Sequence, residues 1–220
     1  MKASLRVFHK SIFETYHQLG FVLRISLLWL LCSIPIVTIG FATIGLLYSI
    51  EKKQKGEDDF HNFFIGMKRY QKPTLLLTVL YAVIMIPGGV YFSILFSLNN
   101  IWAISFSFAL LYLMFSVQFM MMYMVSLMVK QNLLDVKLII IRSFRLFIEN
   151  VSFTLNLSIY ILLITILSLL VPILLLVWAG LLGFIAYYSL LYLLAKYESR
   201  PYEPDLEVSW RGAWKPWKAY

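Results

Sequence analysis

Three long stretches of this chain carry no charged side chain, and they decide what it can fold into. No Asp, Glu, Lys or Arg lies between Arg24 and Glu51, between Lys72 and Lys130, or between Glu149 and Lys196. These runs hold 26, 57 and 46 residues. A membrane-spanning helix needs about 20 mostly apolar residues. The second and third runs are each long enough for two spans, and we expect an all-α integral membrane protein.

The composition supports the same class. Of the 220 residues, 61% are hydrophobic and 14% are charged, whereas a soluble domain carries roughly a quarter charged residues. The apolar surplus is too large for a water-soluble core. We expect no cleaved signal peptide, because no small-residue cleavage site follows a short apolar core.

The first charge-free run is the ambiguous one, because its centre reads LLCSIPIVTIG. Pro35, Thr38 and Gly40 are residue types that bend or interrupt a helix, and we take them as a candidate helix break or re-entrant turn. The four charged segments 1–24, 51–72, 130–149 and 196–220 contain 4, 6, 4 and 5 basic residues. If residues 25–50 cross once, the basic residues divide 4 against 15; if the chain returns, all 19 share one side.

The returning path satisfies the tendency of Lys and Arg to stay on the cytoplasmic side. We therefore predict a multi-pass protein of the cell membrane with both termini cytoplasmic and a shallow or re-entrant first pair of helices. Its turn should pack inside the helical bundle, because lipid cannot satisfy non-helical backbone. A single crossing, with five spans in all, is the alternative.

The predicted organisation is one polytopic domain over residues 1–196, followed by a cytoplasmic tail over 197–220. We expect about six membrane-embedded helices in it. Their approximate ranges are 18–34, 38–50, 74–98, 101–129, 151–171 and 174–195.

Two cytoplasmic segments have the pattern of short amphipathic helices, which we call elbow helices. In the first, an apolar face is followed by basic residues that suit anionic lipid head groups. Its residues are Phe60, Phe63, Phe64, Met67, Lys68 and Arg69. The second runs from 135 to 149 and has Arg142 and Arg145 on one stripe and an apolar stripe beside it. The apolar stripe consists of Val136, Ile140, Phe144 and Phe147. A loose internal repeat, in which a span is followed by an elbow helix and a second span, would explain both segments. The alternative is that any loop between membrane spans needs amphipathic ends.

The tail contains Trp210, Trp214 and Trp217 between basic residues. Indole rings favour the interface between membrane and water, so we predict that these residues anchor the tail there. A tail that binds a partner is the alternative.

The sequence offers little chemistry. His9, His17 and His61 are too scattered for a metal site, and no phosphate-binding or nucleophile motif is present. We expect no metal and no cofactor, and only Asp58, Asp59 and His61 could supply acid–base chemistry. The basic residues flank the apolar runs and mix with acids, so we expect lipid rather than nucleic acid as their partner.

The first third of the chain resembles the YesL-like proteins, small Gram-positive bacterial membrane proteins whose domain has no established function. A Leu-Trp-Leu run, a Pro-x-x-Thr-x-Gly motif, a Gly-Glu-Asp turn and a Phe-Phe elbow carry the resemblance. These are Leu28-Trp29-Leu30, then Pro35, Thr38, Gly40 and Ala42, then Gly56-Glu57-Asp58, then Phe63-Phe64 and Lys68. Ser26 and Phe41 stand where the family often has Asn and Pro. Genes of such proteins often neighbour carbohydrate-uptake genes, and the resemblance implies a link to carbohydrate use.

We therefore expect a non-catalytic accessory or regulatory partner of a membrane transporter or sensor complex linked to carbohydrate uptake. A homo-oligomer is compatible with this. The alternative is a small stand-alone permease whose path follows the bend from Pro35 to Gly40. A membrane enzyme is a third and less favoured class.

Overall fold

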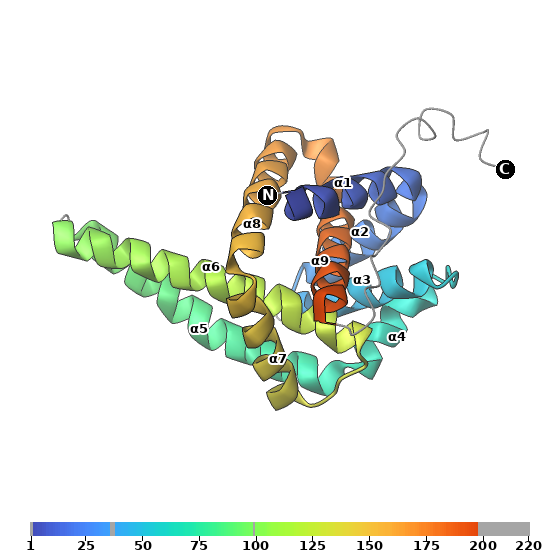
Figure 1. Cartoon of the computed structure of the whole chain (residues 1–220), viewed down its shortest axis with the longest axis horizontal. Coiled ribbons are helices and arrows are strands. Elements are labelled where there is room, and N and C mark those ends of the chain that lie inside the picture. The colour runs from blue at the N-terminus through green and yellow to red at the C-terminus, as the bar shows by residue number, and fades with distance from the viewer. Residues whose placement is uncertain (1, 36–37, 99, 198–220) are drawn as a thin grey trace.

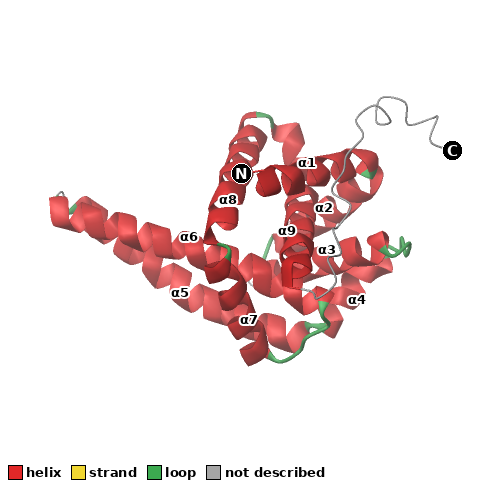
Figure 2. Ribbon diagram, in the orientation of Figure 1, coloured by secondary structure: helices red, strands yellow, loops and turns green. Residues whose placement is uncertain are grey.

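The computed structural model describes residues 2–35, 38–98 and 100–197, and its regular structure there is entirely helical (Figure 2). This confirms the expected all-α class for those residues. The elements are α1 Lys2–His17, α2 Leu19–Ser33, α3 Ile39–Gln54, α4 His61–Arg69, α5 Gln71–Ser97, α6 Ile101–Lys130, α7 Val136–Glu149, α8 Val151–Leu170, the short 3-10 helix η2 Pro172–Leu174 and α9 Leu175–Tyr197.

By length and composition, four of the described segments can cross a membrane: α5, α6, α8 and the combined segment Pro172–Tyr197. The apolar helix α2 has 15 residues, or about 22 Å of helix, which is shorter than a hydrocarbon core of about 30 Å. These lengths suggest a membrane location for the chain. Helices α2 and α3, with 15 and 16 residues, are both shorter than these four segments.

Helices α2 and α3 form a hairpin, so the chain reverses where the sequence places the bend. Helix α2 ends at Ser33 and α3 begins at Ile39. The indole N–H of Trp29 donates to the hydroxyl of Thr43 at 3.2 Å and ties the two arms together. A single straight helix over residues 25–50 is therefore not what this chain forms.

The expectation that the turn packs inside the bundle is wrong. Ile34 is 76% exposed, and Pro35 is exposed as well. The reason is that Thr38 satisfies the turn locally. Its hydroxyl lies within hydrogen-bonding distance of the Cys32 carbonyl and, at 2.7 Å, of the Pro35 carbonyl, and its backbone N–H donates to Pro35 as well. Backbone groups that are paired within the turn need no cover from other helices.

Helix α9 lies at the centre of the fold, between α1, α2 and α3 (Figure 1). Its glycines allow this close packing. The backbone N–H of Gly180 donates to the Ser26 hydroxyl on α2 at 2.9 Å. At Gly183, an added Cβ would lie 2.2 Å from a methyl group of Leu46 on α3. The neighbouring helices thus approach α9 more closely than any larger side chain would permit.

Helix α1 was not predicted from the sequence. It packs against α8 and α9 through Ser4, Val7, Ser11 and Thr15, which are all buried. The hydroxyls of Ser11 and Thr15 donate to carbonyl groups four residues back in their own helix, each at 2.8 Å. Three of these four residues are small and polar, and the Phe8 ring adds an apolar contact by stacking on Tyr160 of α8, with ring centroids 4.7 Å apart.

The α5–α6 hairpin extends away from this centre. Figure 1 shows it running outward to the left, while the α8–α9 turn points in a different direction. Only 6% of the apolar window of α5 is buried, against 61% for the segment containing α9. The two hairpins therefore diverge at their uncharged turns.

Each elbow helix joins the following long helix through one non-helical residue, which we call a hinge. Tyr70 separates α4 from α5, and Asn150 separates α7 from α8. Both side chains are buried. The Tyr70 hydroxyl donates to Asn132 at 2.9 Å, and the Asn150 amide donates to Tyr197 at 2.9 Å. The chain thus repeats one order twice: helix, loop, elbow helix, hinge and long helix.

Candidate functional site

The elbow helix α4 has an inner side that packs into the fold. Phe63 is 1% exposed and Met67 packs against the same core. Two glycines permit this contact. A Cβ added at Gly45 would lie 2.8 Å from the backbone oxygen of Phe63, and one at Gly66 would lie 2.6 Å from the Cβ of Tyr48. These close approaches fix which side of α4 faces inward.

The outer side of α4 is apolar and basic. Phe60 and Phe64 are 56% and 40% exposed, with their ring centres 5.7 Å apart. Ile65, Lys68 and Arg69 are also exposed. The four predicted apolar residues therefore do not form one face: two of them pack inward and two point outward.

The elbow helix α7 is arranged in the same way. Its buried residues are Ile139, Ser143 and Leu146. Of the apolar stripe predicted from the sequence, Val136, Ile140 and Phe147 pack partly against the core, whereas Phe144 is exposed. Ile141, Phe144 and Ile148 are each more than half exposed. Ile141 and Ile148 are not among the residues predicted from the sequence, although their spacing with Phe144 is that of one helical face.

The basic residues of α7 are held in polar contacts beside this exposed apolar surface. Arg142 donates to the Gln131 side chain at 2.6 Å, and Arg145 donates to Glu149 at 2.6 Å. The Tyr197 hydroxyl and Arg145 hydrogen-bond to Glu149 and lower the pKa of its carboxyl group.

We call the exposed apolar and basic residues of both elbow helices the elbow face. It consists of Phe60, Phe64, Ile65, Lys68, Arg69, Ile141, Arg142, Phe144, Arg145 and Ile148. Apolar side chains interleaved with cations are typical of surfaces that lie on anionic membranes or bind amphipathic partners.

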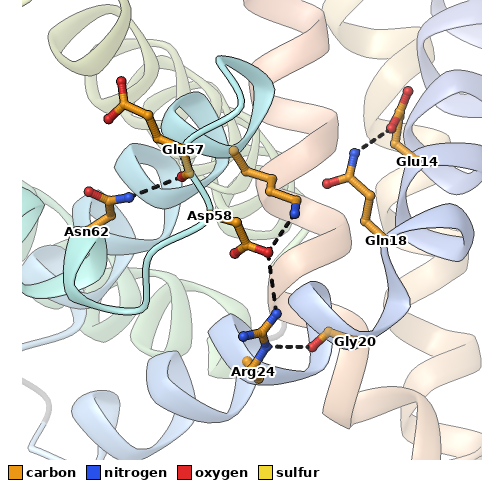
Figure 3. Close-up of polar contacts among 8 residues, drawn as sticks. Glu14, Gln18, Gly20, Arg24, Glu57, Asp58 and Asn62 are labelled. Carbon is orange, nitrogen blue, oxygen red and sulfur yellow. Dashed lines mark hydrogen bonds and ion pairs between the residues drawn. The ribbon is translucent and has the colours of Figure 1, made fainter.

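The loop between α3 and α4 is tied to the start of α2 (Figure 3). The Asp58 carboxylate lies 2.6 Å from the Lys53 ammonium and 3.5 Å from the Arg24 guanidinium. Asn62, in the first turn of α4, donates to the Glu57 carbonyl of the loop at 3.2 Å. The charged ends of α2 and α3 therefore lie at the same end of the hairpin.

The candidate acid–base group forms structural contacts. Asp58 is in the ion pairs described above, and Asp59 accepts the backbone N–H of His61 at 2.9 Å, at the start of α4. Among the residues that the structure describes, no three metal-binding side chains come together. An open groove of about 280 Å³ lies elsewhere, between the first turns of α1 and α8 and the end of α9, with Glu149, Asn150 and Lys196 in its lining.

The remaining predicted site residues lie apart from the elbow face. Pro35 and Thr38 form the hairpin turn. Gly40 faces α5, where an added Cβ would lie 2.0 Å from the Thr78 hydroxyl oxygen. The predicted anchors Trp210, Trp214 and Trp217 lie outside the described residues.

Comparison with known families identifies one part of this arrangement. Residues 22–91 match a family described as "Protein of unknown function, DUF624". The matched segment is roughly a third of the chain. It covers most of α2, the hairpin turn, α3, the Arg24–Asp58 contact, the first elbow helix and most of α5. No curated protein and no solved structure matches the chain.

Proposed function

We propose that this chain is a non-catalytic membrane protein that binds another membrane complex through its elbow face. The elbow face carries this proposal. Both elbow helices bury one side in the fold and leave large apolar side chains and cations uncovered on the other. A surface built twice from the same residue types, beside the ends of long apolar helices, suits a partner located at the membrane surface.

We further propose that both termini and both elbow helices lie on the cytoplasmic side. The Arg24–Asp58 ion pair supports this topology, because it requires the start of α2 and the loop after α3 to share a side. The distribution of basic residues supports the same side for the other charged segments.

A labelling experiment tests this topology. In a Cys32→Ser background, His61→Cys and Leu98→Cys place one thiol at an exposed position in α4 and beside the α5–α6 turn. Intact cells treated with a membrane-impermeant maleimide should label Leu98→Cys and not His61→Cys. Strong labelling of His61→Cys in intact cells would reject the topology, and labelling of both variants after permeabilisation is the control.

The proposed partner complex is a transporter or sensor linked to carbohydrate uptake. The match to the family of unknown function includes the segment that resembles the YesL-like proteins, and the link to carbohydrate rests on that resemblance alone. The chemistry of the elbow face does not select a particular partner of this class.

Packing at the helix break favours the accessory role over a permease. A solute path along Pro35–Gly40 would need space beside Gly40, but Thr78 and Thr74 of α5 fill that position. Likewise, Asp58 and Asp59 are engaged in an ion pair and a helix start, which favours a structural role over an enzymatic one.

Affinity purification of the full chain from native membranes in mild detergent tests the function. We expect stoichiometric transporter or sensor subunits, identified by mass spectrometry. Phe144→Ser in the elbow face should lower their recovery severalfold. Tyr16→Ser is the matched control, because Tyr16 on α1 is 56% exposed and Phe144 is 52% exposed. Equal recovery from Phe144→Ser, or recovery of the chain without other subunits, would count against the proposal.

A further inference from the structure

A glutamine lies in the middle of the longest apolar helix. Gln118 is 17 residues after the start of α6 at Ile101 and 12 residues before its end at Lys130. It is therefore about 26 Å and 18 Å from the two helix ends. When α6 spans a bilayer, this places the carboxamide within the hydrocarbon core, which is about 30 Å thick.

Most serine and threonine hydroxyls of the long helices donate to carbonyl groups of their own helix. Ser105 and Ser116 of α6 donate to carbonyl groups four residues back, each at 2.9 Å. Asn156 of α8 does the same with one of its two amide N–H groups, donating to Ser152 at 2.7 Å. Such local bonds allow a polar side chain to face lipid at little cost.

Gln118 does not follow this pattern. Its carbonyl oxygen accepts a hydrogen bond from the Tyr81 hydroxyl of α5. Its side chain is exposed, and its two amide N–H donors have no acceptor within residues 2–35, 38–98 and 100–197. An unpaired donor in hydrocarbon is costly, and such amides commonly form hydrogen bonds between helices in membranes.

We propose that Gln118 marks a contact between two copies of this chain, formed in the membrane by α6 of each copy. The chemistry favours a second copy because a carboxamide is complementary to itself. Across a two-fold axis, each Nε2–H can donate to the Oε1 of the other copy. Each Oε1 has a second lone pair, so it can continue to accept from its own Tyr81. This arrangement uses one of the two donors that the single chain leaves unpaired.

The surrounding surface is compatible with this contact. The α5–α6 hairpin extends away from the rest of the fold (Figure 1), so a second hairpin can approach it. Phe115 lies one turn before Gln118 on the same side of α6 and is 49% exposed. It would supply apolar contact beside the paired amides. The inference requires only that α6 lies in a bilayer, and it does not depend on the proposed accessory function.

Disulfide cross-linking of the full chain in liposomes tests the contact. In the Cys32→Ser background, Phe115→Cys should form a covalent dimer on oxidation. Leu113→Cys is the matched control, because Leu113 is 51% exposed but points about 140° away from Gln118 around the helix. We expect several times more dimer from Phe115→Cys than from Leu113→Cys.

Adding Gln118→Leu to Phe115→Cys should reduce the dimer to the level of the control. The dissociation constant of the dimer can be measured by energy transfer between labelled copies as the protein is diluted with lipid. We expect it to be about three to thirty times higher for Gln118→Leu than for the native chain. Circular dichroism and gel filtration check that the variant is folded, and the comparison of Phe115→Cys with Leu113→Cys does not need that variant.

Equal cross-linking of the two cysteine variants would overturn the proposal, and so would a dimer unaffected by Gln118→Leu. Oxidation of Phe115→Cys in native membranes gives a further check. A product at the mass of two chains supports the contact. If the product contains a different protein and no dimer forms, the proposal that a second copy binds here is rejected. The surface would then be a contact for another membrane protein.

Discussion

Helix α5 and the segment containing α9 are similar in length and apolar character, yet they occupy opposite environments. They have 27 and 26 residues. The apolar window of α5 is 6% buried, whereas that of the α9 segment is 61% buried. The difference lies in small residues. Helix α9 closely approaches α2 at Gly180 and α3 at Gly183, whereas in α5 Gly88 faces the Met114 side chain of α6 and a Cβ added at Gly89 would meet nothing within 4 Å. Hydropathy predicts which helices can enter a membrane, and the close approaches at Gly180 and Gly183 accompany the central position of α9.

The largest expected effect comes from filling the central glycine contact. In Gly180→Leu, the new side chain would meet Val22 and Ser26 of α2, since even a Cβ would lie 2.6 Å from the Val22 side chain. We expect a loss of about 3 kcal/mol in stability. Thermal unfolding in detergent, followed by circular dichroism, measures it.

Gly89→Leu on α5 is the matched control. An added Cβ there meets nothing within 4 Å, and replacing a mid-helix glycine can stabilise a helix by roughly 0.5–1 kcal/mol. Equal losses in the two variants would mean that the contrast between the helices is not one of packing.

A smaller effect should separate the two halves of α6. Tyr123, which is fully buried, hydrogen-bonds to Thr154 of α8 at 2.8 Å. Tyr123→Phe removes this bond, while Thr154 keeps its bond to the Asn150 carbonyl. We expect a loss of about 1 kcal/mol, measured by the same unfolding experiment. Tyr112→Phe in the exposed half should leave stability unchanged, and a similar loss there would contradict the assignment.

The smallest effect concerns pH and the elbow helix α7. The pKa of Glu149 is lowered in the folded chain by Tyr197 and Arg145. A lowered carboxyl pKa stabilises the fold above the ordinary value of about 4.3, and this contribution is lost as the pH falls through the lowered pKa. The unfolding temperature of the native chain should therefore fall slightly more between pH 6 and pH 3 than that of Glu149→Gln. Identical pH profiles would show that the contact does not influence stability.

Sequence reasoning was informative where the signal was apolar length or a helix-breaking residue. The charge-free runs predict long helices, and the Pro35–Thr38 motif lies at the chain reversal. Helix α1 was missed because it contains Lys2, Arg6, Lys10 and Glu14 and therefore lies outside the charge-free runs.

The orientation of the elbow helices could not be predicted from the sequence. Phe60, Phe63, Phe64 and Met67 are all apolar, so their spacing gives the amphipathic pattern but not the side that packs inward. Two close approaches, of Gly45 to Phe63 and of Gly66 to Tyr48, determine it. Such contacts join residues distant in sequence and leave no local pattern.

The one-residue hinge at Tyr70 has a mechanical consequence. Helix α4 has 9 residues and α5 has 27, or about 13 Å and 40 Å of helix. A single residue separates the two helices, and its hydroxyl is hydrogen-bonded to Asn132. The lengths of the two helices measured from Tyr70 are in a ratio of roughly one to three. When the two helices turn together about Tyr70, a displacement of about 1 Å at the far end of α4 becomes about 3 Å at the α5–α6 turn. With α5 across the bilayer and α4 at its cytoplasmic surface, as proposed above, a partner that displaces α4 would move the α5–α6 turn about three times as far.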